Sequence, residues 1–310
     1  MLSATIDKYA HCHLSRGTDG TVSIRSLDYG STVRYNSTSG PPTSTELSLL
    51  TSTLKRFQLN DGIEMVVRSD SLPGSGLGSS SAMAVAAVGA AWRVSGLKED
   101  LDAIAKTAFL IEREDAGIPG GKQDQYAAAY GGLNFIEFHK EKTSVQRLKV
   151  PDRVLDRLQS RLLLCDTGNR RPSANIINDQ VDGYKSRSKE VVEALDSTKE
   201  LAYKMKTTLL AGHLDNFGRL LNEAWTAKRR FSTRVSNPQI DLMYERAMQS
   251  GAIGGKLLGA GAGGFMIFFC SGSNYAAVAT ELARLGGKVI RFSLVNEGLT
   301  TQLLAGNGGS

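Results

Sequence analysis

Residues 72–87 read LPGSGLGSSSAMAVAA, a glycine- and serine-rich loop that runs without a break into small apolar residues. Gly74, Gly76 and Gly78 allow the backbone to adopt left-handed conformations and to approach a ligand closely. Ser79 and Ser80 stand where a helix begins, so they can cap it and leave backbone N–H groups directed at an anion. The stretch therefore predicts a phosphate site made from backbone groups at the start of a buried helix over residues 80–94.

This loop differs from the familiar nucleotide loop. A Walker A motif places Gly-Lys-Ser/Thr after its spacer, whereas Ser79 follows Gly78 here, so the chain is not predicted to be a P-loop NTPase. Taken alone, the stretch has a second interpretation, a flexible turn before a helix of small residues.

A second glycine-rich segment, GKLLGAGAGGFMIFFC, ends at Cys270. Gly259, Gly261 and Gly264 formally satisfy GxGxxG, but that fingerprint must open a helix, and a strand over residues 266–270 is expected instead. A Rossmann dinucleotide site is therefore disfavoured. The remaining interpretation is a glycine loop that packs against another backbone segment or against a phosphate.

A third segment, IEREDAGIPGGKQDQYAAAYGG, places Asp124 after a glycine turn and Glu112 at the end of the preceding helix. A carboxylate beside a glycine loop can deprotonate a hydroxyl, and a second one can hold a magnesium ion. Each carboxylate by itself is more often a solvated charge or a helix cap. Three glycine loops with carboxylates, and no catalytic Cys/His set, favour phosphoryl transfer.

Composition limits the class of protein. Of 310 residues, 41% are hydrophobic and 22% charged, as in soluble globular proteins, and neither a signal peptide nor a membrane span is recognisable. The three cysteines lie far apart without a CxxC pair, which argues against zinc and disulfides and for a reducing cytoplasm. The net charge is +6, but the basic residues are scattered along the chain without interleaved aromatic residues. Anionic small molecules are therefore expected as partners, and neither nucleic acid nor a membrane is.

The order of elements predicts an α+β fold with two lobes that share one cleft. Alternating residues over 4–10 predict a first strand, and the final β-α-β resembles half of a ferredoxin-like sandwich. An N-terminal α/β lobe is expected over residues 1–155 and a C-terminal ferredoxin-like lobe over 156–305. Further helices are expected over 45–57, 100–114, 240–248 and 275–285, with a helix-rich segment over 188–225.

The three glycine segments together resemble the GHMP kinases, in that family's order and spacing. PGSGLGSSSA is similar to their central ATP-binding motif, GGKQDQYAAAYGG to their catalytic-aspartate segment, and KLLGAGAGGF to their third motif. Phrases such as TGNRRPSANI and NEAWTAKRRFS are most similar to the family's sugar kinases acting on D-glycero-D-manno-heptose 7-phosphate. The resemblance runs from about Leu2 to Gly298.

The resemblance implies an ATP- and Mg²⁺-dependent kinase that phosphorylates the anomeric C1 hydroxyl of this sugar. The heptose 1,7-bisphosphate would lead toward nucleotide-activated heptose for surface polysaccharide. Asp124 would take the proton of the hydroxyl, and Ser80 with Glu112 would hold Mg²⁺. The residues implied to bind ATP are Pro73, Gly74, Ser75, Gly76, Leu77, Gly78, Ser79, Ser80 and Ser81. Those implied to bind the substrate are Gly120, Gly121, Lys122, Arg170, Arg171, Gly259, Gly261 and Gly263.

The phosphate already on the sugar requires a cation. Arg170 and Arg171 are candidates because bidentate arginine suits phosphate, and Lys228, Arg229 and Arg230 lie in another matching segment. By the resemblance, the sequence begins at Met1 downstream of the family's usual first strand and its GGGTD-like loop, which helps to hold the sugar. The resemblance leaves a homodimer open.

Other functions stay open at this stage. One is another sugar specificity in the family, such as a galactokinase- or fucokinase-like activity. Another is a non-catalytic descendant that binds nucleotide or sugar and regulates another process, although such a protein has no need of Asp124. A basic nucleic-acid binder has only the net charge in its favour.

Overall fold

The computed structural model describes residues 1–17, 19–36, 38–41, 47–71, 74–169 and 174–304. The chain divides into two compact units. Unit 1 contains Met1–Asp7, Pro73–Gly78 and Gly132–Val295, and unit 2 contains Lys8–Leu72, Ser79–Gly131 and Asn296–Ser310. Each unit thus combines segments that are far apart in the sequence. The single lobe boundary expected between residues 155 and 156 stays a prediction.

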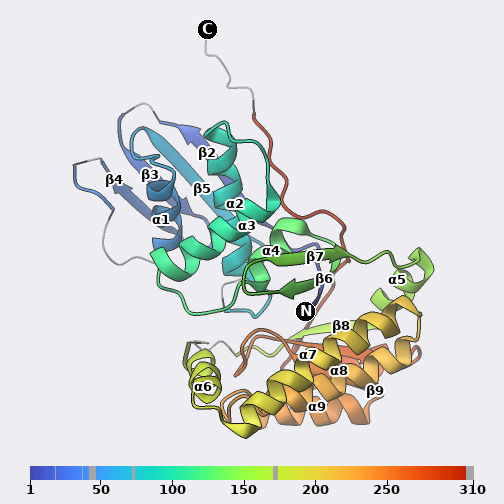
Figure 1. The fold of residues 1–310 in the computed structure, drawn as a ribbon. Coiled ribbons are helices and arrows are strands. Elements are labelled where there is room, and N and C mark those ends of the chain that lie inside the picture. Colours follow the sequence, from blue (N-terminus) through green and yellow to red (C-terminus); the bar gives the residue numbers. More distant parts are fainter. Residues whose placement is uncertain (18, 37, 42–46, 72–73, 170–173, 305–310) are drawn as a thin grey trace. The chain divides into compact units, whose positions relative to one another are not determined.

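Unit 2 is built on a four-stranded sheet of order β2-β5-β3-β4. β3 and β5 are parallel, and the other neighbours are antiparallel. The strands are β2 (Ala10–Arg16), β3 (Val22–Ser26), β4 (Ser31–Tyr35) and β5 (Ile63–Ser69). Because strand side chains alternate between faces, Ile24 and Met65 point into one core, where they join Leu54 of α1 (Ser48–Arg56) and Ala87 of α2 (Ser79–Val94). Figure 1 shows α1 and α2 beside this sheet.

The remaining helices of unit 2 carry the acidic segment. Asp100 caps α3 (Leu101–Leu110) by accepting a hydrogen bond from the Ala103 N–H at 3.0 Å. The single helix expected over 100–114 instead passes into a π-helical turn, η1 (Ile111–Asp115), closed by a bond from the Ala116 N–H to the Ile111 carbonyl. A short helix, α4 (Gln123–Tyr130), follows the IPGG turn.

A late segment of the chain completes unit 2. The Leu299 N–H donates to the Ala129 carbonyl at 3.1 Å. The Leu299 side chain fills the space beside Gly89, where an added Cβ would lie 2.8 Å from both of its methyl carbons. Gly298 lies against the backbone of Tyr130 and Gly131. Helix α2 therefore packs against Leu299 near the end of the sequence as well as against β2 near its beginning.

Unit 1 contains a four-stranded antiparallel sheet of order β11-β8-β10-β9. The strands are β8 (Leu162–Asp166), β9 (Ala252–Leu257), β10 (Phe265–Cys270) and β11 (Lys288–Ile290). With β8 counted as the first strand, this is the 4-1-3-2 order of a ferredoxin-like sheet. The expected ferredoxin-like topology is confirmed.

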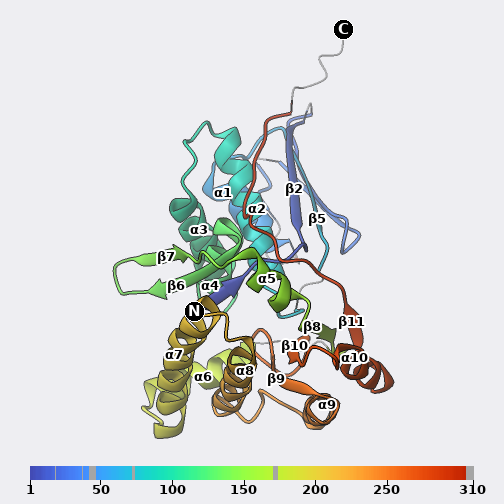
Figure 2. The same ribbon diagram turned by 90° about the vertical axis from the view of Figure 1, so that its right-hand side faces the viewer.

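Helices cover both faces of this sheet. α9 (Pro238–Gln249) and α10 (Tyr275–Arg284) share one core with it, and α7 (Lys189–Leu210) and α8 (Leu214–Arg229) share the other. Figure 2 shows α7 and α8 side by side. α8 approaches β9 so closely that a Cβ on Gly254 would lie 2.0 Å from the Gly218 carbonyl oxygen.

A second, three-stranded sheet in unit 1 has the order β1-β6-β7. Its strands are β1 (Leu2–Ala4), β6 (Leu133–Phe138) and β7 (Thr143–Arg147), and α5 (Asp152–Gln159) and α6 (Ala174–Lys185) complete the unit. The single strand expected over residues 4–10 is wrong, because β1 ends at Ala4 and β2 begins at Ala10, with the passage between units at Asp7 and Lys8. In the described part of the chain, no helix is long and apolar enough to cross a membrane.

Candidate active site

The first glycine loop, residues 74–78, lies in unit 1 and leads directly into α2. Gly74, Gly76 and Gly78 have φ values of 76°, 81° and 76°, alternating with Ser75 and Leu77, which do not have positive φ. Such alternation is typical of the backbone nests in which successive N–H groups bind an anion. The expected left-handed glycines are therefore present at all three positions. Pro73, also expected here, lies outside the described residues.

The last glycine loop, residues 258–264, packs against the first one. The Phe265 N–H donates to the Ser75 carbonyl at 3.0 Å. A Cβ on Gly264 would lie 2.3 Å from the Ser75 oxygen, and one on Gly259 would lie 2.6 Å from Gly76 Cα. The two loops are thus in backbone-to-backbone contact, which only glycine permits at these positions.

The other glycines of this loop also pack against backbone. A Cβ on Gly261 would meet Val235 at 2.9 Å, and one on Gly263 would meet the Asn169 carbonyl at 2.6 Å. These contacts account for Gly259, Gly261 and Gly263 without a bound sugar. Their expected role in substrate binding stays a prediction.

Lys228, at the end of α8, holds the start of the last glycine loop. Its ammonium donates to the Leu257 carbonyl at 2.9 Å and to the Gly259 carbonyl, and the residue is only 7% exposed. Burial lowers its pKa well below the usual value, and the neighbouring Lys256 lowers it further. Lys228 therefore positions the loop rather than presenting a free surface charge.

The other expected phosphate ligands are also engaged or lie elsewhere. Arg229 pairs with Asp241 at 3.4 Å, and Arg230 pairs with Glu193 at 2.9 Å. Arg170 and Arg171 lie outside the described residues. A further cation, Lys256 on β9, was not expected from the sequence. It is partly buried and has no hydrogen-bond or ion-pair partner in the described part of the chain.

In unit 2, Glu112 is the centre of a buried polar cluster. It lies in the π-helical turn and is 2% exposed. Its Oε1 accepts a hydrogen bond from Ser80 at 2.8 Å, and its Oε2 accepts one from Ser81 at 2.8 Å and one from Gln125 at 2.6 Å. The expected pair of Ser80 and Glu112 is therefore brought together. The sequence offered no signal for Gln125.

The pair fits a magnesium ion. Neighbouring oxygens around an octahedral Mg²⁺ lie about 2.9 Å apart, close to the 2.8 Å between Ser80 Oγ and Glu112 Oε1. No group of three or more His, Cys, Asp or Glu side chains in the described residues could hold a metal ion. One carboxylate and one hydroxyl suit Mg²⁺, which usually keeps waters and shares its shell with substrate phosphates.

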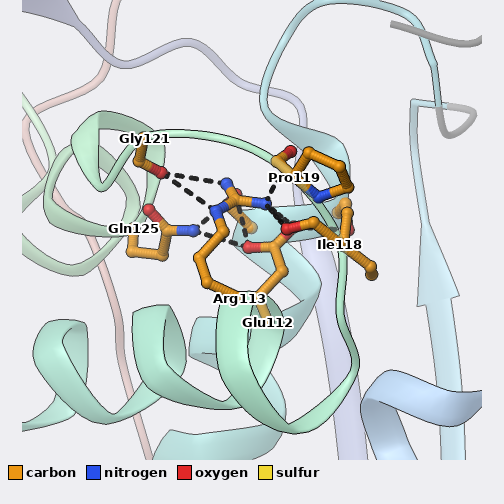
Figure 3. A network of polar contacts seen from close by, with 8 residues as sticks. Glu112, Arg113, Ile118, Pro119, Gly121 and Gln125 are labelled. Atoms are coloured by element: carbon orange, nitrogen blue, oxygen red, sulfur yellow. Dashed lines mark hydrogen bonds and ion pairs between the residues drawn. The ribbon is translucent and has the colours of Figure 1, made fainter. Parts of the chain in front are cut away.

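Arg113 holds the IPGG loop, residues 118–121, against this cluster (Figure 3). Its guanidinium donates to the carbonyls of Ile118, Pro119 and Gly121 and lies 3.5 Å from Glu112 Oε1. A Cβ on Gly120 would lie 2.6 Å from the guanidinium carbon, so glycine makes room for the arginine. This explains Gly120 by packing, whereas the substrate-binding role expected for Gly120, Gly121 and Lys122 stays a prediction.

Asp124 stands in the first turn of α4, next to this cluster, and is partly buried. Burial raises the pKa of its carboxyl, and the charge of Glu112 raises it further, while Arg113 and a hydrogen bond with Gln123 act in the opposite direction. A carboxylate whose pKa is raised is a stronger base while it stays ionised. Burial and the neighbouring Glu112 therefore suit Asp124 to the role of a general base.

Comparison with known proteins identifies relatives along nearly the whole chain. The model of the GHMP kinases N terminal domain matches residues 48–132, and that of the GHMP kinases C terminal matches residues 205–288. A relative from Campylobacter jejuni, D-glycero-alpha-D-manno-heptose 7-phosphate kinase, is 34% identical over 305 residues. That alignment covers 96% of this chain and 89% of the relative.

Solved structures agree with this likeness. A crystal structure described as a D-glycero-D-manno-heptose 1-phosphate kinase from Bacteroides thetaiotaomicron superposes with a TM-score of 0.78 at 29% identity, covering 96% of this chain and 88% of that one. A putative sugar kinase from Campylobacter jejuni has a TM-score of 0.77 at 33% identity, with the same coverage. Lactococcus lactis galactokinase, at 15% identity and a TM-score of 0.78, shares the fold.

Proposed function

This chain belongs to the GHMP kinase family, and we propose that it transfers the γ-phosphate of ATP to the anomeric C1 hydroxyl of D-glycero-D-manno-heptose 7-phosphate. It is an ATP-dependent sugar kinase of the heptose-phosphate kind. The position of the new phosphate, the product heptose 1,7-bisphosphate and the use of Mg²⁺ are parts of the proposal. The carrying observation is the partly buried Asp124 beside the Ser80–Glu112 pair, in a chain 34% identical to a heptose 7-phosphate kinase.

In the proposed reaction, the Asp124 carboxylate accepts the proton of the C1 hydroxyl. The sugar oxygen then forms a bond to the γ-phosphorus of ATP, while the bond from that phosphorus to the β,γ-bridging oxygen breaks and ADP leaves with the electron pair. An anomeric hydroxyl is more acidic than an ordinary alcohol, which makes a carboxylate a sufficient base. The rest of the rate enhancement comes from positioning and charge stabilisation.

The nucleotide would be bound mainly by backbone groups. The N–H groups of residues 74–78 would bind ATP phosphates, and the positive end of the α2 dipole would stabilise their charge. Ser80 and Glu112 would hold Mg²⁺, which would neutralise charge on the phosphates. On the sugar side, Arg170 and Arg171 remain the proposed ligands of the existing phosphate, since Lys228, Arg229 and Arg230 bond to protein groups.

A substrate panel tests this proposal. The purified chain is incubated with ATP, Mg²⁺ and, separately, heptose 7-phosphate, heptose 1-phosphate, fucose, galactose and mevalonate, and ADP release is measured. We expect turnover with heptose 7-phosphate, and ³¹P NMR should place the new phosphate on C1. Asp124→Asn should abolish it.

Other outcomes would contradict the proposal in different ways. Turnover of heptose 1-phosphate alone would show that the phosphorylated hydroxyl is not the one on C1. Turnover of fucose or galactose alone would show that the substrate is a different sugar. ATP binding without turnover of any sugar, together with an unaltered Asp124→Asn variant, would indicate a non-catalytic regulator.

A further inference from the structure

Gln125 makes an unusual set of contacts for a side chain that is completely buried. Its Nε2 donates to Glu112 Oε2 at 2.6 Å and to Ser81 Oγ at 3.1 Å. Its Oε1 is also buried, yet it accepts no hydrogen bond from any residue that the structure describes. A buried amide oxygen without a partner is unfavourable, so a compensating role is expected of the other half of the amide.

The orientation of this amide follows from Glu112. With the nitrogen and oxygen exchanged, the amide oxygen would face a carboxylate oxygen at hydrogen-bond distance, and the two acceptors would repel. Only the orientation that leaves Gln125 Oε1 without a partner lets the Gln125 amide donate to Glu112. The amide is therefore oriented by its hydrogen bond to the Glu112 carboxylate.

The contacts divide the Glu112 carboxylate into two unequal halves. Oε2 accepts from Ser81 and Gln125, two buried residues, and this fixes its direction. Oε1 faces the Ser80 hydroxyl at 2.8 Å, with Arg113 more distant at 3.5 Å. We propose that Gln125 and Ser81 are positioning residues that hold Oε2, so that Oε1 and Ser80 together present a preformed pair of oxygens to the nucleotide-bound cation. This inference rests on the proposed function, because it assumes that this pair binds Mg²⁺.

The position of Gln125 in the chain adds a second consequence. It directly follows Asp124 in the first turn of α4. The same turn therefore carries the proposed base and the amide that holds the proposed metal ligand. A shift of α4 would displace both groups together, which ties the geometry of proton transfer to that of the cation.

The test separates metal binding from nucleotide binding. The dissociation constant of AMP-PNP is measured by calorimetry with and without Mn²⁺. The constant without Mn²⁺ divided by the constant with Mn²⁺ reports the contribution of the metal site to binding. Gln125→Met keeps the length of the side chain and removes its hydrogen bonds. We expect it to reduce this ratio by about 10- to 100-fold, the usual effect of losing a residue that orients a metal ligand, with little change in metal-free affinity.

Further variants keep the inference falsifiable. Ser81→Ala removes only a hydroxyl and should lower the same ratio if Gln125→Met does not fold. Gln146→Met makes the same chemical change at an exposed residue of β7, where it removes a hydrogen bond from Lys206, and should leave the ratio unchanged. Glu112→Gln tests the metal site itself and should abolish the effect of Mn²⁺.

The outcomes distinguish two failures. If Mn²⁺ has no effect on the wild-type chain, or if Glu112→Gln retains the wild-type ratio, the proposed metal site is wrong. If Glu112→Gln loses the effect of Mn²⁺ while Gln125→Met and Ser81→Ala stay within twofold of wild type, the positioning role is wrong. Equal loss of metal-free and Mn²⁺-supported affinity would likewise overturn it, since that indicates a general structural defect.

Discussion

Substitution of Gly264 by alanine should separate the two glycine loops of unit 1. Gly264 has a φ of 92°, and an added Cβ would lie 2.3 Å from the Ser75 carbonyl oxygen and 2.9 Å from its carbon. Both distances are far inside van der Waals contact, and the obstructing atoms are backbone, so a rotamer change cannot relieve them. The hydrogen bond from the Phe265 N–H to the same Ser75 oxygen would be lost as the loops move apart.

The expected magnitude has three parts. A non-glycine residue at this φ costs about 1–3 kcal/mol, and forcing a methyl group into packed backbone costs about 1–3 kcal/mol more. Alanine returns about 0.4–1 kcal/mol by restricting the unfolded chain. Gly264→Ala should therefore lower the free energy of unfolding of unit 1 by about 1–6 kcal/mol.

Urea denaturation followed by tryptophan fluorescence measures this effect. The chain has two tryptophans, and Trp225 is buried in unit 1 while Trp92 lies on α2 of unit 2. A Trp92→Phe background therefore makes the fluorescence specific to unit 1. The affinity for ATP should fall as well, because the first glycine loop would lose its support.

Two alanine variants serve as matched controls. Gly286, also in unit 1, has a φ of 84° and no described atom within 4 Å of an added Cβ, so Gly286→Ala measures the backbone strain alone. Gly272, in the same unit, has neither positive φ nor a described neighbour within that distance. The reasoning fails if Gly264→Ala destabilises unit 1 no more than Gly286→Ala does.

Four further predictions follow from the site and its surroundings. Activity should rise as pH increases through the raised pKa of Asp124, because its carboxylate must be ionised to accept a proton. Asp124→Asn should be more stable than wild type at pH 7 but not below pH 4, and denaturant unfolding at the two pH values measures this difference. Arg113→Met should remove the hydrogen bonds that hold the IPGG loop and lower the free energy of unfolding by about 2 kcal/mol. It should also move the acid limb of the pH–rate profile to higher pH, because Arg113 lowers the pKa of Asp124, and an unmoved limb would contradict this role. Burial lowers the pKa of Lys256, so Lys256→Met should be more stable than wild type at pH 7, with an advantage that shrinks as pH rises toward 10.5; an advantage independent of pH would refute the charge argument. Gly89→Ala should stabilise a Leu299→Ala background by up to about 1 kcal/mol through helix propensity but not the wild-type chain, and equal effects in both backgrounds would mean that Leu299 does not fill this space.

The sequence predicted those parts of the structure that depend on local patterns. The left-handed glycines of the first loop, the helix after them and the strand after the last loop follow from residue type and periodicity, and they are confirmed. The π-helical turn at Glu112 and helix α4 escaped prediction, because neither has a distinctive apolar repeat. Contacts between distant residues were also invisible. Nothing in the pattern indicates that Gln125 meets Glu112, or that Gly264 is required by the Ser75 carbonyl.

The contact of residues 298 and 299 with helix α2 and Gly131 has a consequence for biosynthesis. A ribosome produces the rest of unit 2, up to Gly131, long before it reaches Leu299, and at 5–20 residues per second the interval is roughly ten to thirty seconds. During that time the Leu299 side chain does not cover Gly89, and the greater part of unit 1, Gly132–Val295, is synthesised before unit 2 is complete. Nascent chains stalled before Leu299 should therefore expose α2 to proteases or chaperones, and release of the finished chain should end that exposure.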